Sequence, residues 1–383
     1  MTFSAQAVLD AMTTVVSGSA PLHVPEIAGN EWTYVKECLD TGWVSSVGSY
    51  VDNFGDMLTA ATGAKYVVPT INGTAALHVC LMLAGVEPGD EVIVPALSFA
   101  ATANAVFYCH AVPHFADSEE ATMGLDPGKL EAHLLRIAKS KGGDLLNAQT
   151  GRRISALVCM HTFGHPVDLD GVAKVCDRFG LPLIEDAAES LGSIYKGRHT
   201  GNHGVLSALS FNGNKIVTTG VGGAIITKNS SYAKLSRHLT TTSKIKHKWE
   251  FIHDRVGYNY RISNLNASLG ISQIAKLNKY ISHKRKLFKK FSDLIKDEKQ
   301  IKILNQPKNC RSNFWLQTLV LDKPSKLRKT KLLNKFHNKN IFARPVWRPL
   351  HKLKYLKKYP RMNLKNAEKL ENQIINIPSS YYL

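Results

Sequence analysis

The sequence predicts an α/β fold, with a mostly parallel sheet covered by helices on both faces and a smaller C-terminal domain. Three observations support this prediction. Up to about residue 250, short apolar runs alternate with amphipathic helical patterns, which is typical of strand–helix–strand units. Acidic or hydroxyl side chains stand at or next to the ends of two apolar runs. Lysine then becomes frequent beyond about residue 275, which indicates a separate region.

The predicted strands are short apolar runs bounded by turn residues. They cover 91–95, 155–160, 181–186, 208–211 and 223–227. The clearest helix covers 167–180, where apolar residues recur at helical spacing and a glycine ends the pattern. Ligands of such sheets bind beyond the carboxyl ends of the strands. Asp186 and Ser210, which lie at two of these ends, are therefore candidate site residues.

We place the domain boundary near residue 250, with a large α/β domain over 1–250 and a small domain over 251–383. From Lys276 onward there are 28 Lys+Arg and 6 Asp+Glu, out of 49 and 30 in the whole chain. These lysines alternate with Leu, Ile and Phe, which favours a solvated basic surface on amphipathic helices. The alternatives are binding of nucleic acid or of an anionic membrane surface, and attraction of an anionic, phosphate-bearing substrate.

The sequence shows neither a signal peptide nor a membrane span. The first twenty residues contain no Lys or Arg, and no run approaches the roughly 18 apolar residues that a span requires. The six cysteines have scattered spacings without a C-x-x-C pair. We interpret them as reduced thiols and expect no metal site. These features predict a cytoplasmic protein.

A lysine on a glycine-rich loop is the strongest functional signal. Lys215 lies about thirty residues after the apolar run that ends in Glu185 and Asp186. A lysine amine can form a Schiff base with an aldehyde. A buried acid can pair with a pyridinium nitrogen, and a serine with nearby amides can hold a phosphate. Lys215, Asp186 and Ser210 together therefore predict a site for pyridoxal 5′-phosphate (PLP).

Two upstream segments complete this predicted site. Residues 68–77 read as a strand end that turns into a helix through a glycine. The amides of Thr74 and Ala75 would open that helix, where free N–H groups and the helix dipole favour a phosphate. Phe99 follows the next predicted strand and could stack on a flat cofactor ring. A plain N-cap and a core phenylalanine would explain the two segments taken singly, but the downstream lysine and serine favour the cofactor site.

With these residues in place, the chain resembles the PLP-dependent nucleotide-sugar aminotransferases of the DegT/StrS-type family. The resemblance covers nearly the whole chain in ordered blocks. The blocks lie at 42–48, 72–77, 98–105, 185–192, 210–215, 257–264, 344–351 and 376–380. It implies the type I PLP-dependent transferase fold of aspartate aminotransferase, with a mostly parallel seven-stranded sheet in the large domain and a smaller C-terminal α/β domain.

The resemblance also implies a role for each matching residue. Lys215 would be the Schiff-base lysine, Asp186 would pair with the pyridine nitrogen and Phe99 would stack on the ring. The hydroxyl group of Ser210 and the helix start at Thr74 and Ala75 would hold the phosphate. Asn259 would reach the phosphate of the neighbouring subunit's cofactor, so a homodimer would be part of the site.

Glu189 departs from the family pattern. Many members carry glutamine or histidine at this position, near the cofactor's phenolic oxygen. An ionised carboxylate beside a phenolate would be repulsive, so Glu189 is either protonated or directed towards the sugar. We count it among the cofactor-binding residues. The presence of Lys215 argues against the family's dehydratase branch, in which histidine replaces the lysine.

The blocks at 42–48 and 210–215 look most like the branch that aminates C4 of UDP-linked 2-acetamido-2,6-dideoxy-4-keto-hexoses, in bacillosamine and legionaminic acid synthesis. L-Glutamate would be the amino donor. Six side chains could contact the substrate, in part by meeting a diphosphate or a uracil. They are Trp43, Ser45, His161, Arg344, Trp347 and His351. Packing or solvent pairing explains each of them equally well.

The sequence leaves three classes of function open. The first is transamination, either of this sugar or of another nucleotide keto-sugar, such as one of the GDP-perosamine type or a 3-keto sugar. The second is another PLP reaction on the same fold, such as that of a lyase or dehydratase. The third is non-catalytic binding of nucleic acid by the basic C-terminal region. We favour the first, without nucleic acid as a partner.

Overall fold

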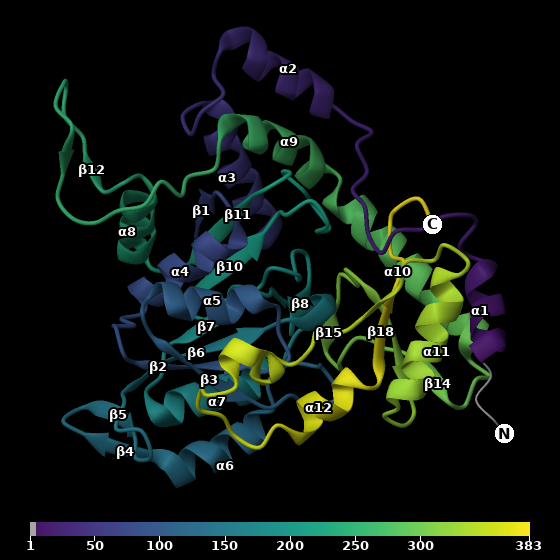
Figure 1. Cartoon of the computed structure of the whole chain (residues 1–383). Coiled ribbons are helices and arrows are strands. Elements are labelled where there is room, and N and C mark those ends of the chain that lie inside the picture. Colours follow the sequence, from purple (N-terminus) through teal and green to yellow (C-terminus); the bar gives the residue numbers. More distant parts are fainter. Residues whose placement is uncertain (1–4) are drawn as a thin grey trace.

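The computed structural model describes residues 5–383 (Figure 1). Its largest sheet has seven strands, in the spatial order β1 (Tyr66–Thr70), β11 (Gly223–Thr227), β10 (Leu206–Ser210), β7 (Leu183–Asp186), β6 (Ile154–Met160), β2 (Glu91–Pro95) and β3 (Val112–Ala116). Neighbouring strands are parallel, except that β11 is antiparallel to both β1 and β10. The predicted α/β fold with a mostly parallel sheet is confirmed.

The carboxyl ends of the parallel strands meet at one edge of this sheet. Asp186, the last residue of β7, pairs in register with Met160 at the end of β6. On the other side β10 extends past Asp186 and ends at Ser210. Because β11 runs in the opposite direction, its first residue, Gly223, faces both Ser210 and Thr70. Residues far apart in the sequence are thereby brought together at this edge.

Helices surround the sheet in the larger body of the molecule. They are α2 (Glu31–Thr41), α3 (Ser49–Thr62), α4 (Gly73–Leu83), α5 (Ala100–Tyr108), α6 (Pro127–Ile137), α7 (Leu169–Phe179), α8 (Ser230–Thr240) and α9 (Asn264–Ala275). The helix predicted at 167–180 is α7. The Asp168 side chain caps its start, and Gly180 ends it with a φ of 66°, in the left-handed region that favours glycine.

A second hydrophobic cluster lies in a smaller body that draws on both ends of the chain. Its antiparallel sheet has the order β14 (Ile301–Ile303), β16 (Gln317–Leu321), β18 (Ile374–Ile377) and β17 (Arg344–Pro345). The helices α1 (Ala5–Thr13), α10 (Leu277–Ile295) and α11 (Lys326–His337) contribute buried side chains to the same cluster. In Figure 1, α1 accordingly lies beside α11. The domain boundary near residue 250 stays a prediction.

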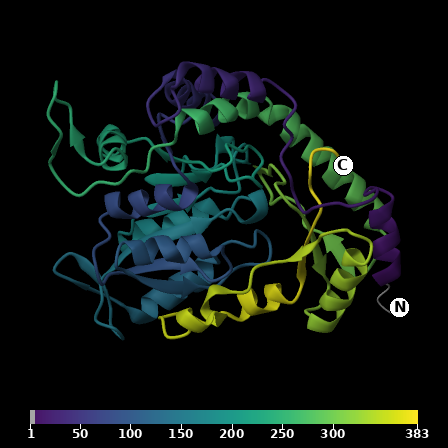
Figure 2. The same ribbon diagram turned by 45° about the horizontal axis from the view of Figure 1, so that its top comes forward.

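The bodies are joined by a pair of consecutive helices and by a small sheet, among other contacts. α9 ends at Ala275 and α10 begins at Leu277, so the two helices run almost end to end between the bodies (Figure 2). In addition, β15 (Cys310–Arg311) pairs with β8 (Ile194–Tyr195), which pairs with β9 (Arg198–His199). The segment after β15 therefore reaches the larger body, where the Asn313 side chain donates to the carbonyl of Glu189 at 2.9 Å.

The strands and the α-helix not yet named lie at the periphery. They are the hairpin of β4 (Ala138–Lys141) and β5 (Asp144–Asn147), the hairpin of β12 (Lys244–Ile245) and β13 (Ile252–His253), and α12 (Lys365–Glu371). The β12–β13 hairpin projects from the larger body (Figure 1). All six cysteines are buried and have free thiols. Within residues 5–383, no helix has the length and apolarity needed to cross a membrane.

Candidate active site

A cavity of about 310 Å³ lies at the carboxyl edge of the large sheet. This volume is at the lower end of the range for small-molecule sites, about 300–1,000 Å³. Seven of the predicted site residues line it, namely Thr74, Phe99, Asp186, Glu189, Ser210, Lys215 and Trp347. The sheet therefore gathers side chains from five separate blocks of the sequence around one space.

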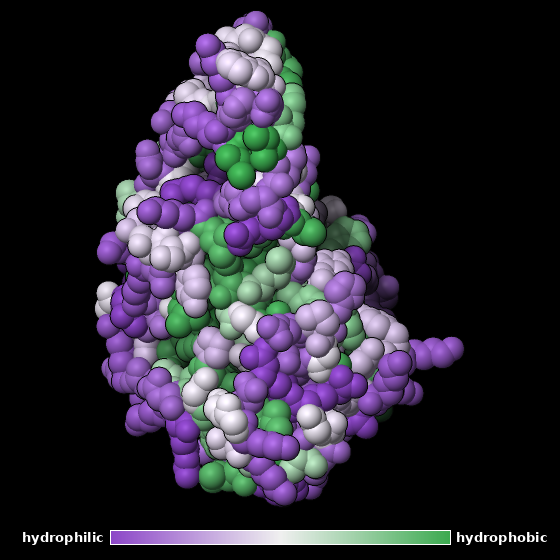
Figure 3. Space-filling model, turned by 90° about the vertical axis from the view of Figure 1, so that its left-hand side faces the viewer, coloured by the Kyte–Doolittle hydropathy of each residue, from purple (hydrophilic) through white to green (hydrophobic). Residues whose placement is uncertain are grey.

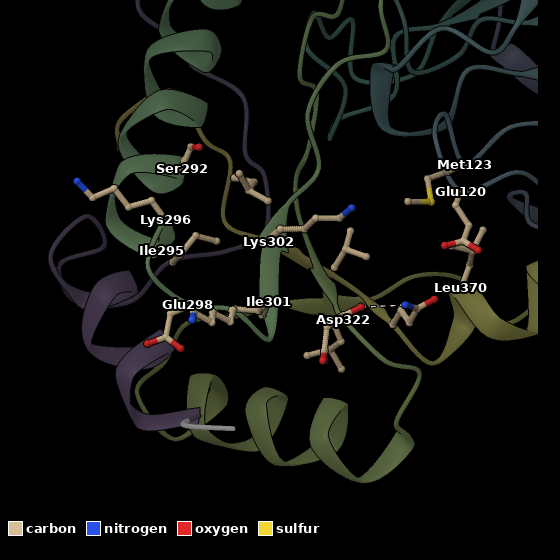
Figure 4. Close-up of a pocket in the computed structure, with 15 residues that line it drawn as sticks. Glu120, Met123, Ser292, Ile295, Lys296, Glu298, Ile301, Lys302, Asp322 and Leu370 are labelled. Atoms are coloured by element: carbon tan, nitrogen blue, oxygen red, sulfur yellow. Dashed lines mark hydrogen bonds between the residues drawn. The ribbon is translucent and has the colours of Figure 1, made fainter. Parts of the chain in front are cut away.

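A larger cavity of about 400 Å³ lies elsewhere, beside β14 and the end of α10 (Figure 4). Its lining mixes lysines such as Lys296 and Lys302 with acids such as Glu120 and Asp322, and it contains none of the predicted site residues. Glu120 is already paired with Lys369 at 2.5 Å. We place the candidate active site in the 310 Å³ cavity. Of the two cavities, only this one brings the predicted lysine, acids and phosphate-binding residues together.

Asp186 brings a buried acid to the floor of the cavity. Its side chain accepts hydrogen bonds from the Thr102 hydroxyl at 2.8 Å and from the Ala188 amide at 3.3 Å. Burial raises the pKa of this carboxyl group, whereas the hydrogen bonds and nearby Lys215 lower it. An ionised Asp186 is therefore favoured by a cationic partner inside the cavity, and a pyridinium N–H is such a partner.

Lys215 presents its amine to the same cavity. The Nζ atom donates to Glu189 Oε1 at 3.2 Å and lies 4.0 Å from the centre of the Trp315 ring. The indole N–H of Trp315 donates to the carbonyl of Asn214 at 2.8 Å, which fixes the loop next to the lysine. The Lys215 side chain is 13% exposed. The amine is thus shielded from bulk water but accessible from the cavity.

Glu189 is directed towards Lys215. Its second carboxylate oxygen accepts from the Phe163 amide at 2.9 Å, and the side chain is 2% exposed. Burial raises its pKa, the charge of Lys215 opposes that shift, and Asp186 adds to it. A carboxyl group in this position can exchange a proton with the lysine amine.

The start of α4 forms an anion cradle against Ser210. The N–H groups of Gly73 and Thr74 belong to the first helical turn, which offers them no intrahelical acceptor. A Cβ atom on Gly73 would come within 2.9 Å of the Ser210 Cβ, so only glycine allows this close approach. The predicted role of Ala75 needs correction: its amide donates to the Asn72 side chain at 2.7 Å, because Asn72 caps the helix.

Aromatic rings form the wall of the cavity. Phe99 lies just before α5 and is 56% exposed, so it is not the core phenylalanine of the alternative interpretation. Its ring centre lies 6.4 Å from that of Trp347, which lies 5.1 Å from that of Phe163. An exposed ring at this place is available to stack on a bound aromatic ring.

The prediction that His161 contacts substrate is wrong. The residue is fully buried, its Nδ1 accepts from the Val167 amide at 3.3 Å, and its Nε2 lies 3.0 Å from a Glu185 carboxylate oxygen. Because an amide can only donate, Nε2 carries the hydrogen. His351 also fails to reach the cavity, since it is 7% exposed and bonded to Glu368 at 2.9 Å. Both histidines have structural roles.

Four other predicted residues lie outside the cavity of their own chain. Trp43, Ser45, Asn259 and Arg344 are exposed. Trp43 and Ser45 precede α3, Asn259 pairs with Thr241 at the base of the β12–β13 hairpin, and Arg344 opens β17. Their predicted contacts with substrate or with a neighbouring subunit stay predictions.

Sequence reasoning missed Trp315, which closes the cavity over Lys215. The residue follows β15 in the lysine-rich region of the chain and has no motif around it. Met160 and Asn214 also line the cavity without having been predicted. Met160 ends a predicted strand, so the strand-end rule that selected Asp186 would have found it.

The residues present fit PLP. A lysine amine suits its aldehyde, a buried acid suits its ring nitrogen, an exposed ring suits stacking, and the cradle of Gly73, Thr74 and Ser210 suits its phosphate. In the described chain this acid, lysine and anion cradle lie around one cavity. On this sheet they define a PLP-dependent enzyme as the class of protein.

Comparison with known proteins gives the family. The model of the DegT/DnrJ/EryC1/StrS aminotransferase family matches residues 25–383. Three of the relatives are named GDP-perosamine synthase. The one from Escherichia coli O157:H7 is 33% identical over 362 residues, covering 94% of this chain and 93% of its own length. The one from Caulobacter vibrioides is 32% identical over 356 residues, covering 93% of this chain and 91% of its own length.

Among solved structures, the aminotransferase TlmJ from Streptoalloteichus hindustanus superimposes with a TM-score of 0.85. It is 24% identical and covers 96% of this chain and 95% of its own, which supports the fold. The chain belongs to the DegT/DnrJ/EryC1/StrS aminotransferase family. It is a PLP-dependent sugar aminotransferase.

Proposed function

We propose that this enzyme transfers the amino group of L-glutamate to C4 of a GDP-linked 4-keto-6-deoxyhexose. The convergence of Lys215, Asp186 and the phosphate cradle on one cavity supports the chemistry. Two relatives that match more than nine-tenths of this chain and carry the name GDP-perosamine synthase support the acceptor. The amino donor and the sugar would use the same cavity in turn.

A UDP-linked 2-acetamido-2,6-dideoxy-4-keto-hexose is the second candidate acceptor. The blocks at 42–48 and 210–215 favour it. The names of the two relatives favour GDP, and we rank the GDP-linked sugar first for that reason. The two candidates differ in nucleotide base and in the substituent at C2, so a substrate panel separates them.

When bound, PLP supplies the aldehyde that accepts the amino group and the ring that withdraws electrons from the carbon losing a proton. We propose that Lys215 Nζ would hold the cofactor through this aldehyde and, once the amino group of the donor has displaced it, would accept as a neutral amine the proton that leaves the α carbon of glutamate. Glu189, 3.2 Å away, would take a proton from the ammonium form of Nζ beforehand and so keep the amine neutral for that step. Trp315 would keep water from the amine.

Asp186 is proposed to keep the ring nitrogen protonated through a charge-assisted hydrogen bond. The phosphate would accept N–H groups from Gly73 and Thr74 and the Ser210 hydroxyl. Phe99 would stack on the ring, and Trp347 would face the substrate from the same wall. Each assignment uses a side chain or amide that lines the cavity or opens α4.

We also propose a homodimer with shared active sites. The β12–β13 hairpin exposes large apolar side chains, with Trp249 70% and Phe251 79% exposed, and Val256 beyond it is 77% exposed. Figure 3 views the molecule from the side on which the hairpin projects in Figure 1, and hydrophobic surface is exposed there among hydrophilic side chains. Such a surface needs a partner in water. Asn259, at the hairpin's base, would then contact the cofactor phosphate of the other subunit.

A panel of nucleotide 4-keto-sugars with ¹⁵N-labelled L-glutamate tests the proposal. We expect the PLP-loaded enzyme to incorporate label at C4 of the GDP-linked 4-keto-6-deoxyhexose, as shown by mass spectrometry and NMR. The matched control is Lys215→Ala, which should bind PLP without its visible lysine-bound band and transfer no label. Preferential labelling of the UDP-linked sugar would replace the first candidate by the second, and labelling by the Lys215→Ala variant would contradict the role of the lysine.

A further inference from the structure

Lys284 is a buried lysine that the proposed chemistry does not use. It lies in the middle of α10, is 2% exposed, and donates to two backbone carbonyls, those of Trp315 at 3.0 Å and Ser379 at 2.6 Å. Among residues 5–383, no carboxylate is paired with it. Burial lowers its pKa to about 7. A buried ammonium without an acidic partner costs stability, so its contacts call for an explanation.

One of the two carbonyls belongs to the residue that covers Lys215. The backbone of Trp315 is held at both ends, since its N–H donates to the Asn313 side chain at 2.8 Å and its carbonyl accepts from Lys284. The ring between these anchors lies 4.0 Å from Lys215 Nζ. Asn313 in turn donates to the carbonyl of Glu189 at 2.9 Å. A single hydrogen bond therefore connects Lys284 to Trp315, a residue of the active-site wall.

The second carbonyl connects Lys284 to both ends of the chain. The Ser379 N–H donates to the carbonyl of Leu22 at 2.8 Å, and the Ser379 hydroxyl accepts from the Gln317 amide at 2.7 Å. Gln317 also donates through its side chain to the carbonyl of Lys284 at 2.9 Å. One ammonium group thus fastens the segment that carries Trp315 to α10, to the C-terminal segment and, through it, to the N-terminal segment.

We propose that Lys284 is a positioning residue for transamination, which holds Trp315 against the amine of Lys215. This inference rests on the proposed role of Lys215. Without the Lys284 ammonium, the carbonyl of Trp315 loses its buried donor, and the segment from 313 to 317 can shift. A displaced indole admits water to the amine and releases the carbonyl of Asn214, so the lysine is no longer held in its reactive orientation.

A matched control is available in Lys329. This residue of α11 is 8% exposed, and its amine donates to the backbone carbonyl of Glu371. Burial lowers its pKa as well. Neither Lys329 nor Glu371 lines the cavity of the active site. Replacing it by methionine removes a buried ammonium and a lysine-to-carbonyl bond from the smaller body and leaves Trp315 untouched.

The experiment compares Lys284→Met and Lys329→Met as PLP-loaded enzymes. The half-reaction with L-glutamate is followed by the loss of the cofactor's visible absorbance, and the cofactor's visible circular dichroism is recorded at rest. We expect Lys284→Met to lower the maximal rate at least about tenfold and to alter the dichroic band, with a smaller change in the glutamate concentration at half-maximal rate. Lys329→Met should lose thermal stability only.

A double-mutant cycle with Trp315→Phe tests whether Lys284 acts through the indole. Adding Lys284→Met to Trp315→Phe should slow the half-reaction far less than it slows the wild type, because the positioned group has already been removed. Additive losses, or equal losses in the Lys284 and Lys329 variants, would overturn the proposal. Should Lys284→Met fail to fold, Lys284→Gln, whose side chain is one bond shorter and replaces the amine by an amide, carries the same comparison with a smaller expected loss of rate. A visible lysine-bound band in Lys215→Ala would instead refute the proposed function.

Discussion

Asp186 and Glu189 are two buried carboxyl groups, three positions apart, with different partners. Asp186 accepts from a threonine hydroxyl and a backbone amide, whereas Glu189 faces the Lys215 amine. Burial raises the pKa of both. Different surroundings give two acids different tasks, which here means a counter-ion for the cofactor ring and a proton partner for the lysine.

Replacing Asp186 by asparagine tests its role directly. Asparagine keeps the shape but removes the charge that would hold the ring nitrogen protonated. A charge-assisted hydrogen bond contributes about 1.5–3 kcal/mol, so we expect kcat to fall about 10- to 150-fold while PLP still binds. Steady-state kinetics on the PLP-loaded variant measures this. A near-normal kcat would contradict the assignment.

The same variant has a pH signature in the apoprotein. Because burial raises the folded-state pKa of Asp186 above its unfolded value, the folded protein holds a proton that the unfolded chain has already released. This contribution to stability is present at low pH and is lost as pH rises through the folded-state pKa. As pH rises above the ordinary aspartate pKa of about 4, Asp186→Asn should therefore lose less stability than the wild type. Denaturant unfolding at a series of pH values measures the free energy of unfolding of both proteins. If the carboxyl group were not buried, this free energy would change with pH equally in the wild type and in Asp186→Asn.

At the scale of the element, the turn from β1 into α4 decides whether a phosphate can bind. Asn72 caps the helix by accepting from the amide of Ala75, and this leaves Gly73 and Thr74 as the amides of the first turn that face Ser210. Gly223, opposite them at the start of β11, is equally constrained, because a Cβ there would lie 2.4 Å from the Asn72 backbone. Two glycines thus let three elements approach one another.

Gly73→Ala should weaken PLP binding while the chain still folds. The added Cβ would lie 2.9 Å from the Ser210 Cβ and 3.1 Å from the carbonyl of Leu209, so the cradle must open. We expect PLP affinity, measured by titration of the apoprotein, to fall at least about tenfold, which corresponds to about 1.4 kcal/mol. Gly128→Ala is the control, since its Cβ would meet nothing closer than 3.6 Å. Equal affinities in the two variants would exclude the cradle as the phosphate site.

At the scale of the whole molecule, the projecting hairpin predicts how the chain assembles. Replacing Trp249 and Phe251 by serine should shift a dimer towards monomer and lower PLP affinity, because the hairpin also carries Asn259 at its base. Light scattering after size exclusion measures the mass. Leu327→Ser is the control, as this leucine is 80% exposed on α11, in the smaller body. A wild-type monomer, or a dimer that the double variant leaves intact, would contradict the shared site.

The lysine-rich region of the chain folds with most of its charged side chains exposed. The lysine-rich region forms the amphipathic helices α10 and α11, as the sequence predicts, with apolar side chains such as Leu287 and Phe291 inside and most lysines in water. Lys284 and Lys329 are the buried exceptions. The charge of the region therefore lies largely on the surface, while one of its lysines supports the active site.

Local pattern was enough to predict most strands of the large sheet and half of the site. Apolar runs with turn residues at their ends specify strands, and the carboxyl ends of parallel strands share one edge of the sheet. The sequence alone therefore groups Asp186, Ser210 and Lys215 at that edge. A helix that begins at a glycine after a strand is equally local. These inferences hold because backbone geometry and side-chain alternation act over a few residues.

The tertiary structure alone decided which side chains face the cavity. His161 follows a strand end as Asp186 ends one, yet it turns into the core because Glu185 and the Val167 amide occupy its two ring nitrogens. Trp315 covers Lys215 because long-range contacts, among them the pairing of β15 with β8 more than a hundred positions away, bring its segment to the larger body. Long-range packing and hydrogen bonding choose among orientations that the local sequence leaves equal in energy.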